Sequence, residues 1–197
     1  MEICRYVFEP IGTNGYFLYE EDQALMIDPG CDSYEKVAKD HSWKNLTIFC
    51  THSHWDHIAD AARWKKETGA SLWVHPLDAA NLEYPGRDGI PCPLSFAGVS
   101  ADQFFEDQQE IPLFGTSVRI LHTPGHSPGG VCFYFPEKDL LFSGDTMFAG
   151  GCGKTSFPGS DPDAMHRSLS ILHELPEETI VYPGHGPSTV LGKEKSR

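Results

Sequence analysis

Short apolar runs alternate with polar segments along this chain of 197 residues. Runs rich in β-branched and aromatic residues predict strands at residues 16–19, 24–27, 46–50, 71–75, 117–122, 131–135, 140–142 and 179–182, with Val7 in a further short strand. Apolar positions at helical spacing predict helices over residues 34–40, 59–68 and 161–174. Strands in clusters with single helices between them indicate an α/β protein with mixed sheets, and not a regular βαβ array.

Turn-forming residues mark the ends of these elements. Gly69 is a stop signal for the second predicted helix, and Ser160 or Asp161 is a candidate N-cap for the third. Residues 81–103 are rich in Pro and Gly without a clear period, so we expect an irregular segment that lies mostly at the surface. The sequence contains no repeat, low-complexity tract or linker, and we therefore expect residues 1–197 to form a single domain.

The composition narrows the possible partners. Hydrophobic residues make up 40% of the chain, and the formal net charge of −13 disfavours binding to nucleic acid or to anionic membranes. No apolar stretch approaches the roughly 20 residues of a membrane span, and the first ten residues lack a signal-peptide pattern. The six cysteines form no CxxC pair. We expect a cytoplasmic protein with free thiols and no nucleic-acid or membrane partner.

Potential metal ligands are concentrated in the run THSHWDH at residues 51–57. His52, His54, Asp56 and His57 could each bind a metal ion, and the run lies between a predicted strand and a predicted helix. Turns of this kind commonly present functional side chains. Trp55, between the ligands, could line a pocket or pack under the loop, and both possibilities stay open.

Three further loops follow predicted strands and offer one ligand each. They are TPGHS with His126, SGDT with Asp145 and YPGHG with His185. Strand-end loops that are distant in sequence can converge in one crevice, so the chain offers five histidines and two aspartates to one site. Imidazole and carboxylate ligands suit zinc, iron and manganese. His75 and His122 lie near these loops, and we expect structural roles for them.

The ordered motifs HxHxDH, PGH, GD and PGH resemble those of the metallo-β-lactamase superfamily, and the resemblance covers essentially the whole chain. It implies a four-layer αββα sandwich with the metals at one edge between two sheets. The second half, through FSGDTMF and GCGK, is also similar to glyoxalase II. Residues 153–161, GKTSFPGSD, resemble the GRTDFPGGD motif of short glyoxalase II-like hydrolases.

The resemblance implies a ligand set for two metals, zinc first and iron or manganese as alternatives. His52, His54 and His126 would hold one metal, Asp56, His57 and His185 would hold the other, and Asp145 would bridge them. Asp56 and Asp145 are thus the expected catalytic carboxylates, and Asp28 in its Asp-Pro-Gly turn is a candidate to orient a ligand. A water shared by two cations becomes hydroxide near neutral pH and can attack a carbonyl carbon.

On the substrate side, Lys154 after Gly-Cys-Gly resembles the basic residue that contacts glutathione in glyoxalase II. Ser156 stands where that family often has tyrosine, and the family's C-terminal helical domain has no counterpart in this chain. No cysteine replaces Asp145, which weighs against antibiotic hydrolysis. The favoured function is hydrolysis of a small thioester such as S-lactoylglutathione.

The alternative comes from persulfide dioxygenases, which share this resemblance and use one iron held by two His and one Asp. The complete set of Asp56, His57 and His185 favours hydrolysis over that reaction. A nuclease is disfavoured by the acidic balance. A purely structural metal module is disfavoured because such sites are usually closed and rich in cysteine.

Overall fold

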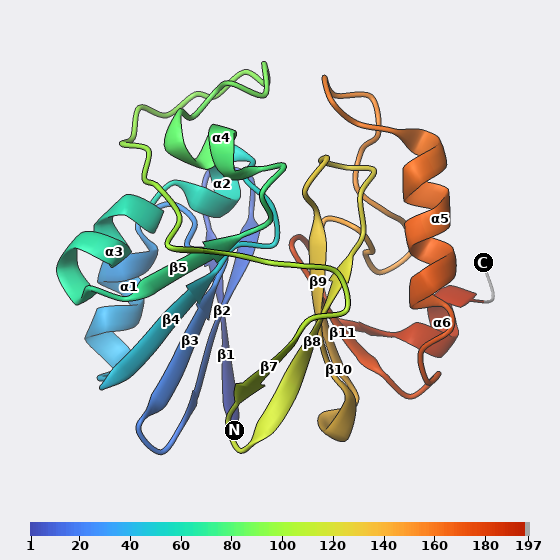
Figure 1. Ribbon diagram of the computed structural model, residues 1–197, viewed down its shortest axis with the longest axis horizontal. Helices are drawn as coiled ribbons and strands as arrows, with labels where there is room; N and C mark the ends of the chain where they lie inside the picture. The colour runs from blue at the N-terminus through green and yellow to red at the C-terminus, as the bar shows by residue number, and fades with distance from the viewer. Residues whose placement is uncertain (196–197) are drawn as a thin grey trace.

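Two mixed β-sheets form the centre of the computed structural model, which describes residues 1–195 (Figure 1). The first sheet has the strand order β1 (Glu2–Phe8), β2 (Thr13–Glu20), β3 (Gln23–Ile27), β4 (Asn45–Phe49), β5 (Ser71–Val74) and β6 (Gln103–Phe104). The second has the order β12 (Thr189–Val190), β11 (Ile180–Pro183), β10 (Leu140–Gly144), β9 (Val131–Phe135), β8 (Thr116–His122) and β7 (Glu110–Leu113).

Strand direction differs between the two sheets. In the first sheet, β1, β2 and β3 are antiparallel neighbours, and β3 through β6 run parallel. In the second sheet only β10 and β11 are parallel. The expectation of mixed sheets is confirmed.

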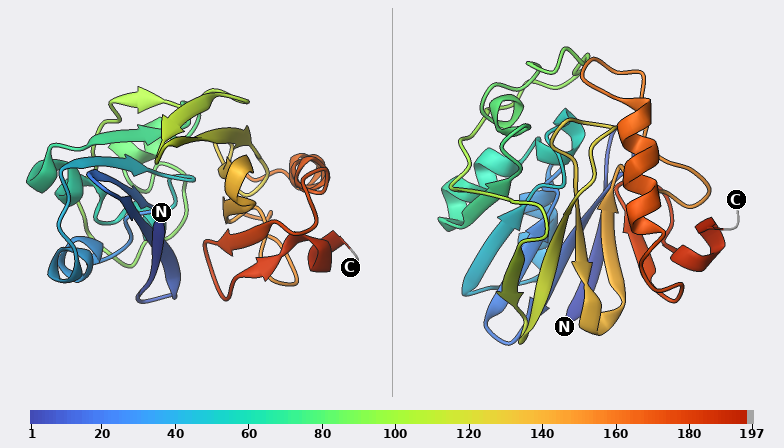
Figure 2. Two further views of the ribbon diagram at one scale, coloured as in Figure 1. Left: turned by 90° about the horizontal axis from the view of Figure 1, so that it is seen from below. Right: turned by 45° about the vertical axis from the view of Figure 1, so that its right-hand side comes forward.

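Helices cover the outer face of each sheet. On the first sheet these are α1 (Ser33–Asp40) and α3 (Ala61–Thr68), and on the second α5 (Pro162–Leu172) and α6 (Leu191–Lys195) (Figure 2). The shorter α2 (Trp55–Ile58) and α4 (Ala79–Glu83) lie near one end of the sheets, and the 3₁₀ turn η1 (Pro136–Lys138) joins β9 to β10. The layers are therefore α, β, β and α, which confirms the predicted four-layer sandwich.

The alternating directions of strand side chains explain the continuous apolar runs. In β3, Ala24 and Met26 join the cluster beneath α1 and α3, whereas Leu25 and Ile27 join the cluster between the two sheets. A third cluster lies between the second sheet and its helices. When both faces of a strand are buried, the side chains on both faces are apolar. Such a strand therefore appears in the sequence as a continuous apolar run.

One predicted helix was wrong in its extent. The helix expected at residues 59–68 begins two residues later, at Ala61, because Ala59 and Asp60 form an interruption that separates α2 from α3. The Asp60 carboxylate accepts a hydrogen bond from the backbone N–H of Tyr34 at 2.7 Å, and its own backbone N–H donates to Pro29 at 3.0 Å. These contacts hold the interruption against α1. Asp161, of the two candidates, caps α5 by accepting from Asp163 and Ala164.

The edge strands were the elements that the hydrophobic pattern missed. β6, β7 and β12 were not predicted, nor were α4, α6 and most of β1. Residues 81–103 are largely irregular as expected, although α4 extends into their first part. All six cysteines are free. Within residues 1–195 we find no helix with the length and apolar character that crossing a membrane requires.

Candidate metal centre

The predicted ligands meet at one end of the sandwich, where four strand-end segments converge (Figure 1). His52 and His54 follow β4, and Asp56 and His57 lie in the short helix α2. The other three come from the β8–β9 loop, the end of β10 and the end of β11 (His126, Asp145 and His185). All are buried except His185, which is partly exposed. The run at residues 51–57 is thus only partly a turn, because its last three residues are helical.

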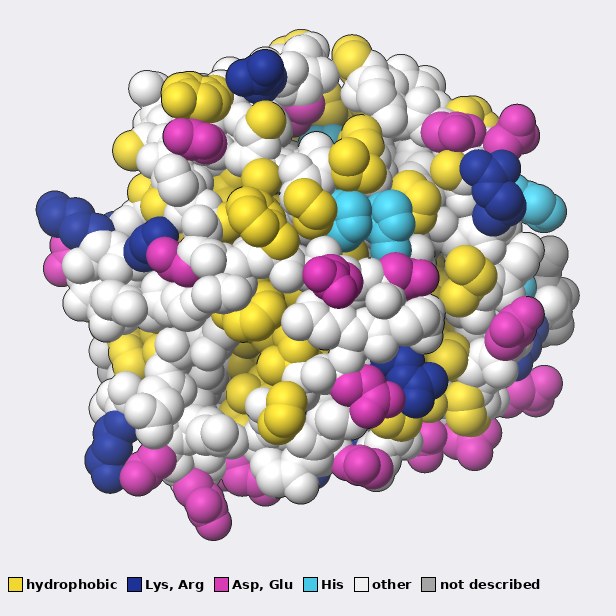
Figure 3. Space-filling view, viewed as in Figure 1, with side chains coloured by type: hydrophobic (Ala, Val, Ile, Leu, Met, Phe, Trp, Pro, Cys, Tyr) yellow, Lys and Arg dark blue, Asp and Glu magenta, His cyan; other side chains and the backbone are white. Residues whose placement is uncertain are grey.

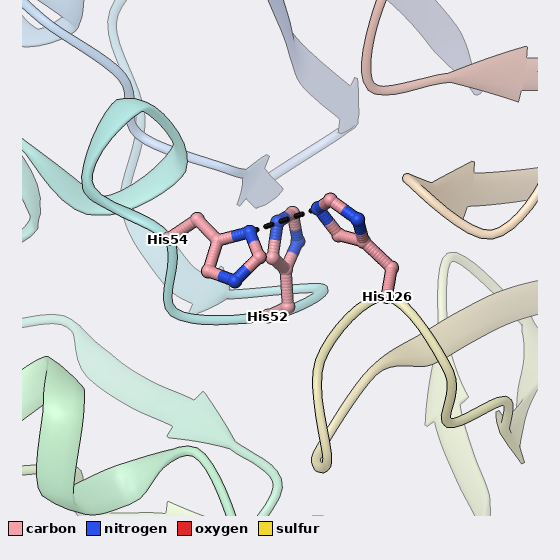
Figure 4. Close-up of side chains that lie close together, drawn as sticks. All are labelled: His52, His54 and His126. Carbon is pink, nitrogen blue, oxygen red and sulfur yellow. Dashed lines mark hydrogen bonds between the residues drawn. The ribbon is translucent and has the colours of Figure 1, made fainter. Parts of the chain in front are cut away.

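Three imidazoles form the first group of potential ligands. The ring nitrogens of His52, His54 and His126 lie within 4.8 Å of one another. His54 Nδ1 is 2.8 Å from His126 Nε2, and Figure 4 shows the His52 ring between them. Burial, together with the neighbouring imidazoles of His126 and His57, lowers the pKa of His54 to about 3. Burial also lowers the pKa of His52. Neutral imidazoles are the form that binds metal.

Asp56, His57 and His185 form a second group. Asp56 Oδ2 lies 3.3 Å from His57 Nε2 and 3.3 Å from His185 Nε2. Burial alone would raise the pKa of the Asp56 carboxyl, but His57 and hydrogen bonds from His185 and Thr13 bring that pKa down to about 2. The Asp56 carboxyl is therefore ionised at neutral pH.

Asp145 lies between the two groups. Its Oδ2 is 3.3 Å from His126 Nε2 and 3.6 Å from His185 Nε2, and its Oδ1 is 3.4 Å from His57 Nε2. Burial opposes ionisation, yet the surrounding imidazoles, His57 first, hold the pKa of Asp145 well below its usual value. A single carboxylate thus contacts both groups, as a bridging ligand would.

The polar atoms at the centre indicate that it is built for cations. His52 Nε2, His57 Nε2 and Asp145 Oδ1 are buried and have no hydrogen-bond partner among the described residues. A buried polar atom without a partner is costly, and native proteins rarely leave several together. Divalent metal ions bound by these nitrogen and oxygen atoms would satisfy them, so the residues present fit a metal site.

The outer ring atoms of the histidines are held by specific partners. Asp28 Oδ2 lies 2.9 Å from His57 Nδ1, and the same carboxylate accepts from the backbone N–H and the hydroxyl of Thr51. His126 Nδ1 lies 2.8 Å from the backbone oxygen of Lys154. Such contacts fix the ring orientation and the tautomer of a ligand. Asp28, which we proposed from its Asp-Pro-Gly turn in the sequence, is therefore in contact with the candidate ligand His57.

Two residues at the centre had no motif to reveal them. The Thr13 hydroxyl donates to Asp56 Oδ2 at 2.6 Å, because the β1–β2 hairpin brings Thr13 beside His185. Asp78 accepts from the backbone N–H groups of Ser53 and Gly129 at 2.8 and 2.7 Å, which ties the loop after β4 to the β8–β9 loop. Thr13 and Asp78 are single polar residues whose partners are distant in sequence, so no sequence motif could indicate their roles.

A cavity of about 230 Å³, which we call the metal-side cavity, is lined by candidate ligands of both groups and by Asp145. Lys154 and Phe157 line it, with the Lys154 ammonium 4.5 Å from the centre of the Phe157 ring. Trp55 also lines this cavity and is buried, so pocket lining and packing under the loop both apply to it. From the irregular segment at residues 81–103, Ile90 lines this cavity.

A sequence model of the metallo-beta-lactamase superfamily matches residues 9–185, which include every predicted ligand. The chain belongs to this superfamily. The implied position of the ligands at one edge between the two sheets agrees with the geometry above.

Two curated relatives of this superfamily member are similar over most of their length. The probable metallo-hydrolase YqgX of Bacillus subtilis is 33% identical over all of this chain and 96% of its own. The hydroxyacylglutathione hydrolase GloC of Haemophilus influenzae is 34% identical over 89% of this chain and 86% of its own.

Two solved structures share the fold. The BLEG-1 B3 metallo-beta-lactamase is 31% identical with a TM-score of 0.89, and the match covers 100% of this chain and 97% of that one. TTHA1623, solved in a di-iron-bound form, is 36% identical with a TM-score of 0.84, covering 98% of this chain and 96% of that one. The superfamily member described here is thus similar to metallo-hydrolases of different specificities.

Proposed function

We propose that this protein is a dinuclear metal-dependent hydrolase of small thioesters, such as S-lactoylglutathione or a related S-hydroxyacyl-glutathione. The observation that supports this most directly is the second ligand group, Asp56, His57 and His185, which is joined to the first through Asp145. Two adjacent cation sites suit hydrolysis of a carbonyl compound. The similarity to a hydroxyacylglutathione hydrolase agrees with a thioester as the substrate class.

The reaction consumes one water. Its oxygen forms a bond with the thioester carbon, the carbon–sulfur bond breaks with its electron pair on sulfur, and the products are a carboxylate, a thiol and one proton. The bound cations would supply an activated water and stabilise the negative charge that develops on the carbonyl oxygen. No serine or cysteine nucleophile is required.

The residues of the chain hold this arrangement in place. Asp145 and Asp56 supply the ionised carboxylates, and the seven ligands come from four strand-end segments whose backbone is fixed by the two sheets. Asp28 and the Lys154 carbonyl orient His57 and His126. The Lys154 ammonium, exposed beside the metal-side cavity, would bind a carboxylate of the thiol half of the substrate.

We propose zinc as the metal, with iron or manganese as the other ions that this ligand set suits. All seven ligands are imidazoles or carboxylates, and none is a thiolate. The similar structure TTHA1623 was solved with two irons, which agrees with a two-metal site that accepts iron.

Turnover assays test the function. Purified protein should hydrolyse S-lactoylglutathione, measured by loss of thioester absorbance and release of thiol, and it should consume no oxygen with glutathione persulfide. Oxygen uptake with the persulfide and no thioester hydrolysis would instead support the dioxygenase alternative. Hydrolysis of a β-lactam in the absence of thioester turnover would also contradict the proposal.

A further inference from the structure

A second cavity, of about 320 Å³, meets the metal-side cavity at His54. His54 lines both cavities. The segment before α5 contributes Phe157 to the metal-side cavity and the adjacent Pro158 to the second. The Phe157 ring contacts the His54 and His126 rings edge-on at 5.8 Å. Apart from His54, the two cavities are lined by different residues.

The far wall of the second cavity is formed by α4 and the turn that follows it. Figure 1 shows this segment and the segment before α5 rising at the same end of the molecule. Leu77, just before α4, also lines the cavity with 61% of its surface exposed, and Pro128 and Pro158 add apolar surface. A cavity of this volume, largely apolar with a few polar groups, is typical of small-molecule sites.

The acidic side chains in the wall already have partners. Asp78 accepts from two backbone N–H groups, and Asp88 accepts from the Asn81 amide at 2.9 Å and from the Ile90 backbone N–H at 2.9 Å. These bonds fix the turn around residue 87 from both sides. They also use the carboxylate oxygens for the internal structure, so the acidic groups are engaged before any ligand arrives.

Arg87 differs from these acids. It is exposed, it is the sole Lys or Arg in the lining of the second cavity, and within residues 1–195 its side chain makes no hydrogen bond or ion pair. On the face seen in Figure 3, Lys and Arg side chains are scattered among acidic ones. In a chain with a net charge of −13, an unpaired guanidinium beside a cavity is a specific feature. A guanidinium binds carboxylates with two parallel hydrogen bonds.

We infer that the second cavity binds the acyl half of the substrate, and that this acyl chain ends in a carboxylate that pairs with Arg87. The inference rests on the proposed thioester hydrolysis. A thioester carbon has two substituents that point apart, and Lys154 in the metal-side cavity would hold the thiol half. The acyl chain then extends past His54 along Leu77 and Pro158 to Arg87. Within the proposed class of small thioesters, the favoured substrate is therefore a monothioester of a short dicarboxylic acid.

Four synthetic thioesters separate the two halves of the substrate. Succinyl and butyryl groups, which differ in the terminal carboxylate, are each attached to glutathione and to neutral N-acetylcysteamine. Arg87→Ala should raise KM about fivefold for both succinyl thioesters, with a much smaller change for the butyryl pair. Lys154→Ala should instead raise KM for both glutathione thioesters, whatever the acyl group. Arg87→Lys should recover part of the loss.

Arg167→Ala is the matched control, because it removes the same charge from the exposed face of α5 and lines neither cavity. It should leave all four KM values unchanged. An equal effect of Arg87→Ala on succinyl and butyryl thioesters would overturn the acyl assignment while leaving thioester hydrolysis intact. If Arg87→Ala raises KM for both glutathione thioesters, whatever the acyl group, Arg87 would contact the thiol half of the substrate. That result would also overturn the acyl assignment. If wild-type protein hydrolyses none of the four thioesters, that result would contradict the proposed function itself.

Discussion

At the scale of single residues, the candidate centre depends on carboxylates whose charge is held by their neighbours. Asp56 and Asp145 are buried, and burial alone would favour their neutral forms. Imidazoles and hydrogen-bond donors reverse that preference. Thr13 is one of these donors and is itself buried, with 1% of its surface exposed.

Removing the Thr13 hydroxyl should weaken the second metal group. Thr13→Val keeps the shape of the side chain but loses the bond to Asp56 Oδ2, and affinity at the Asp56–His57–His185 group should fall by roughly 10–100-fold. Competition with a fluorescent chelator measures this change. Thr13→Ser retains a hydroxyl and should stay close to wild type. Unaltered affinity in Thr13→Val would show that the contact does not position Asp56.

At the scale of elements, short segments that follow strands bring the candidate ligands together. The segment between β10 and α5 passes so close to the centre that a side chain at Gly153 would meet the Asp145 backbone oxygen at 2.1 Å and the His126 ring at 2.9 Å. The Gly153 backbone N–H also donates to that oxygen at 2.9 Å. Glycine is required there by this close approach.

Gly153→Ala should therefore disturb the centre. We expect a loss of unfolding free energy of about 1–3 kcal/mol, as in other overpacked sites, together with reduced metal content. Gly151→Ala is the control from the same loop, because a side chain at Gly151 would meet nothing within 4 Å. Chemical denaturation and metal analysis of both variants test this. Equal stability of the two variants would contradict the packing argument.

The same scale shows what could be predicted from the sequence. The central strands were predictable because both of their faces are buried, which leaves continuous apolar runs such as β3. The ligands were predictable because HxHxDH and the three later motifs are short and local. Thr13, Asp78 and the cavity beside Arg87 were not, because each depends on contacts between segments distant in sequence. The edge strand β7, half exposed, left no apolar run.

At the scale of the whole molecule, a stacked histidine pair links the ends of the two sheets. His75 follows β5 and His122 ends β8, and their rings are parallel with centres 4.1 Å apart. Burial, together with the charge that His122 would carry, lowers the pKa of His75 to about 4, and Asp107 opposes this only in part. The structural roles expected for this pair stay a prediction.

This pair should make the stability of the protein sensitive to acid. An unfolded His75 takes up a proton near pH 6.5, whereas the folded one does so near pH 4, so the unfolded state binds more protons between these values. The free energy of unfolding should then fall as the pH is lowered from 6.5 towards 4. His75→Gln should reduce this fall, and His166→Gln, on the exposed face of α5, should not. Identical pH profiles for wild type and His75→Gln would contradict the assignment.

The central claim is a two-metal centre joined by Asp145, and metal content measured by plasma mass spectrometry tests it most directly. The protein should contain about two metal atoms per chain. Asp145→Ala should lose most of both, since Asp145 contacts both ligand groups, whereas Asp22→Ala, at an exposed ion pair, should retain them. One metal atom per chain in the wild type, or a full complement in Asp145→Ala, would contradict the account.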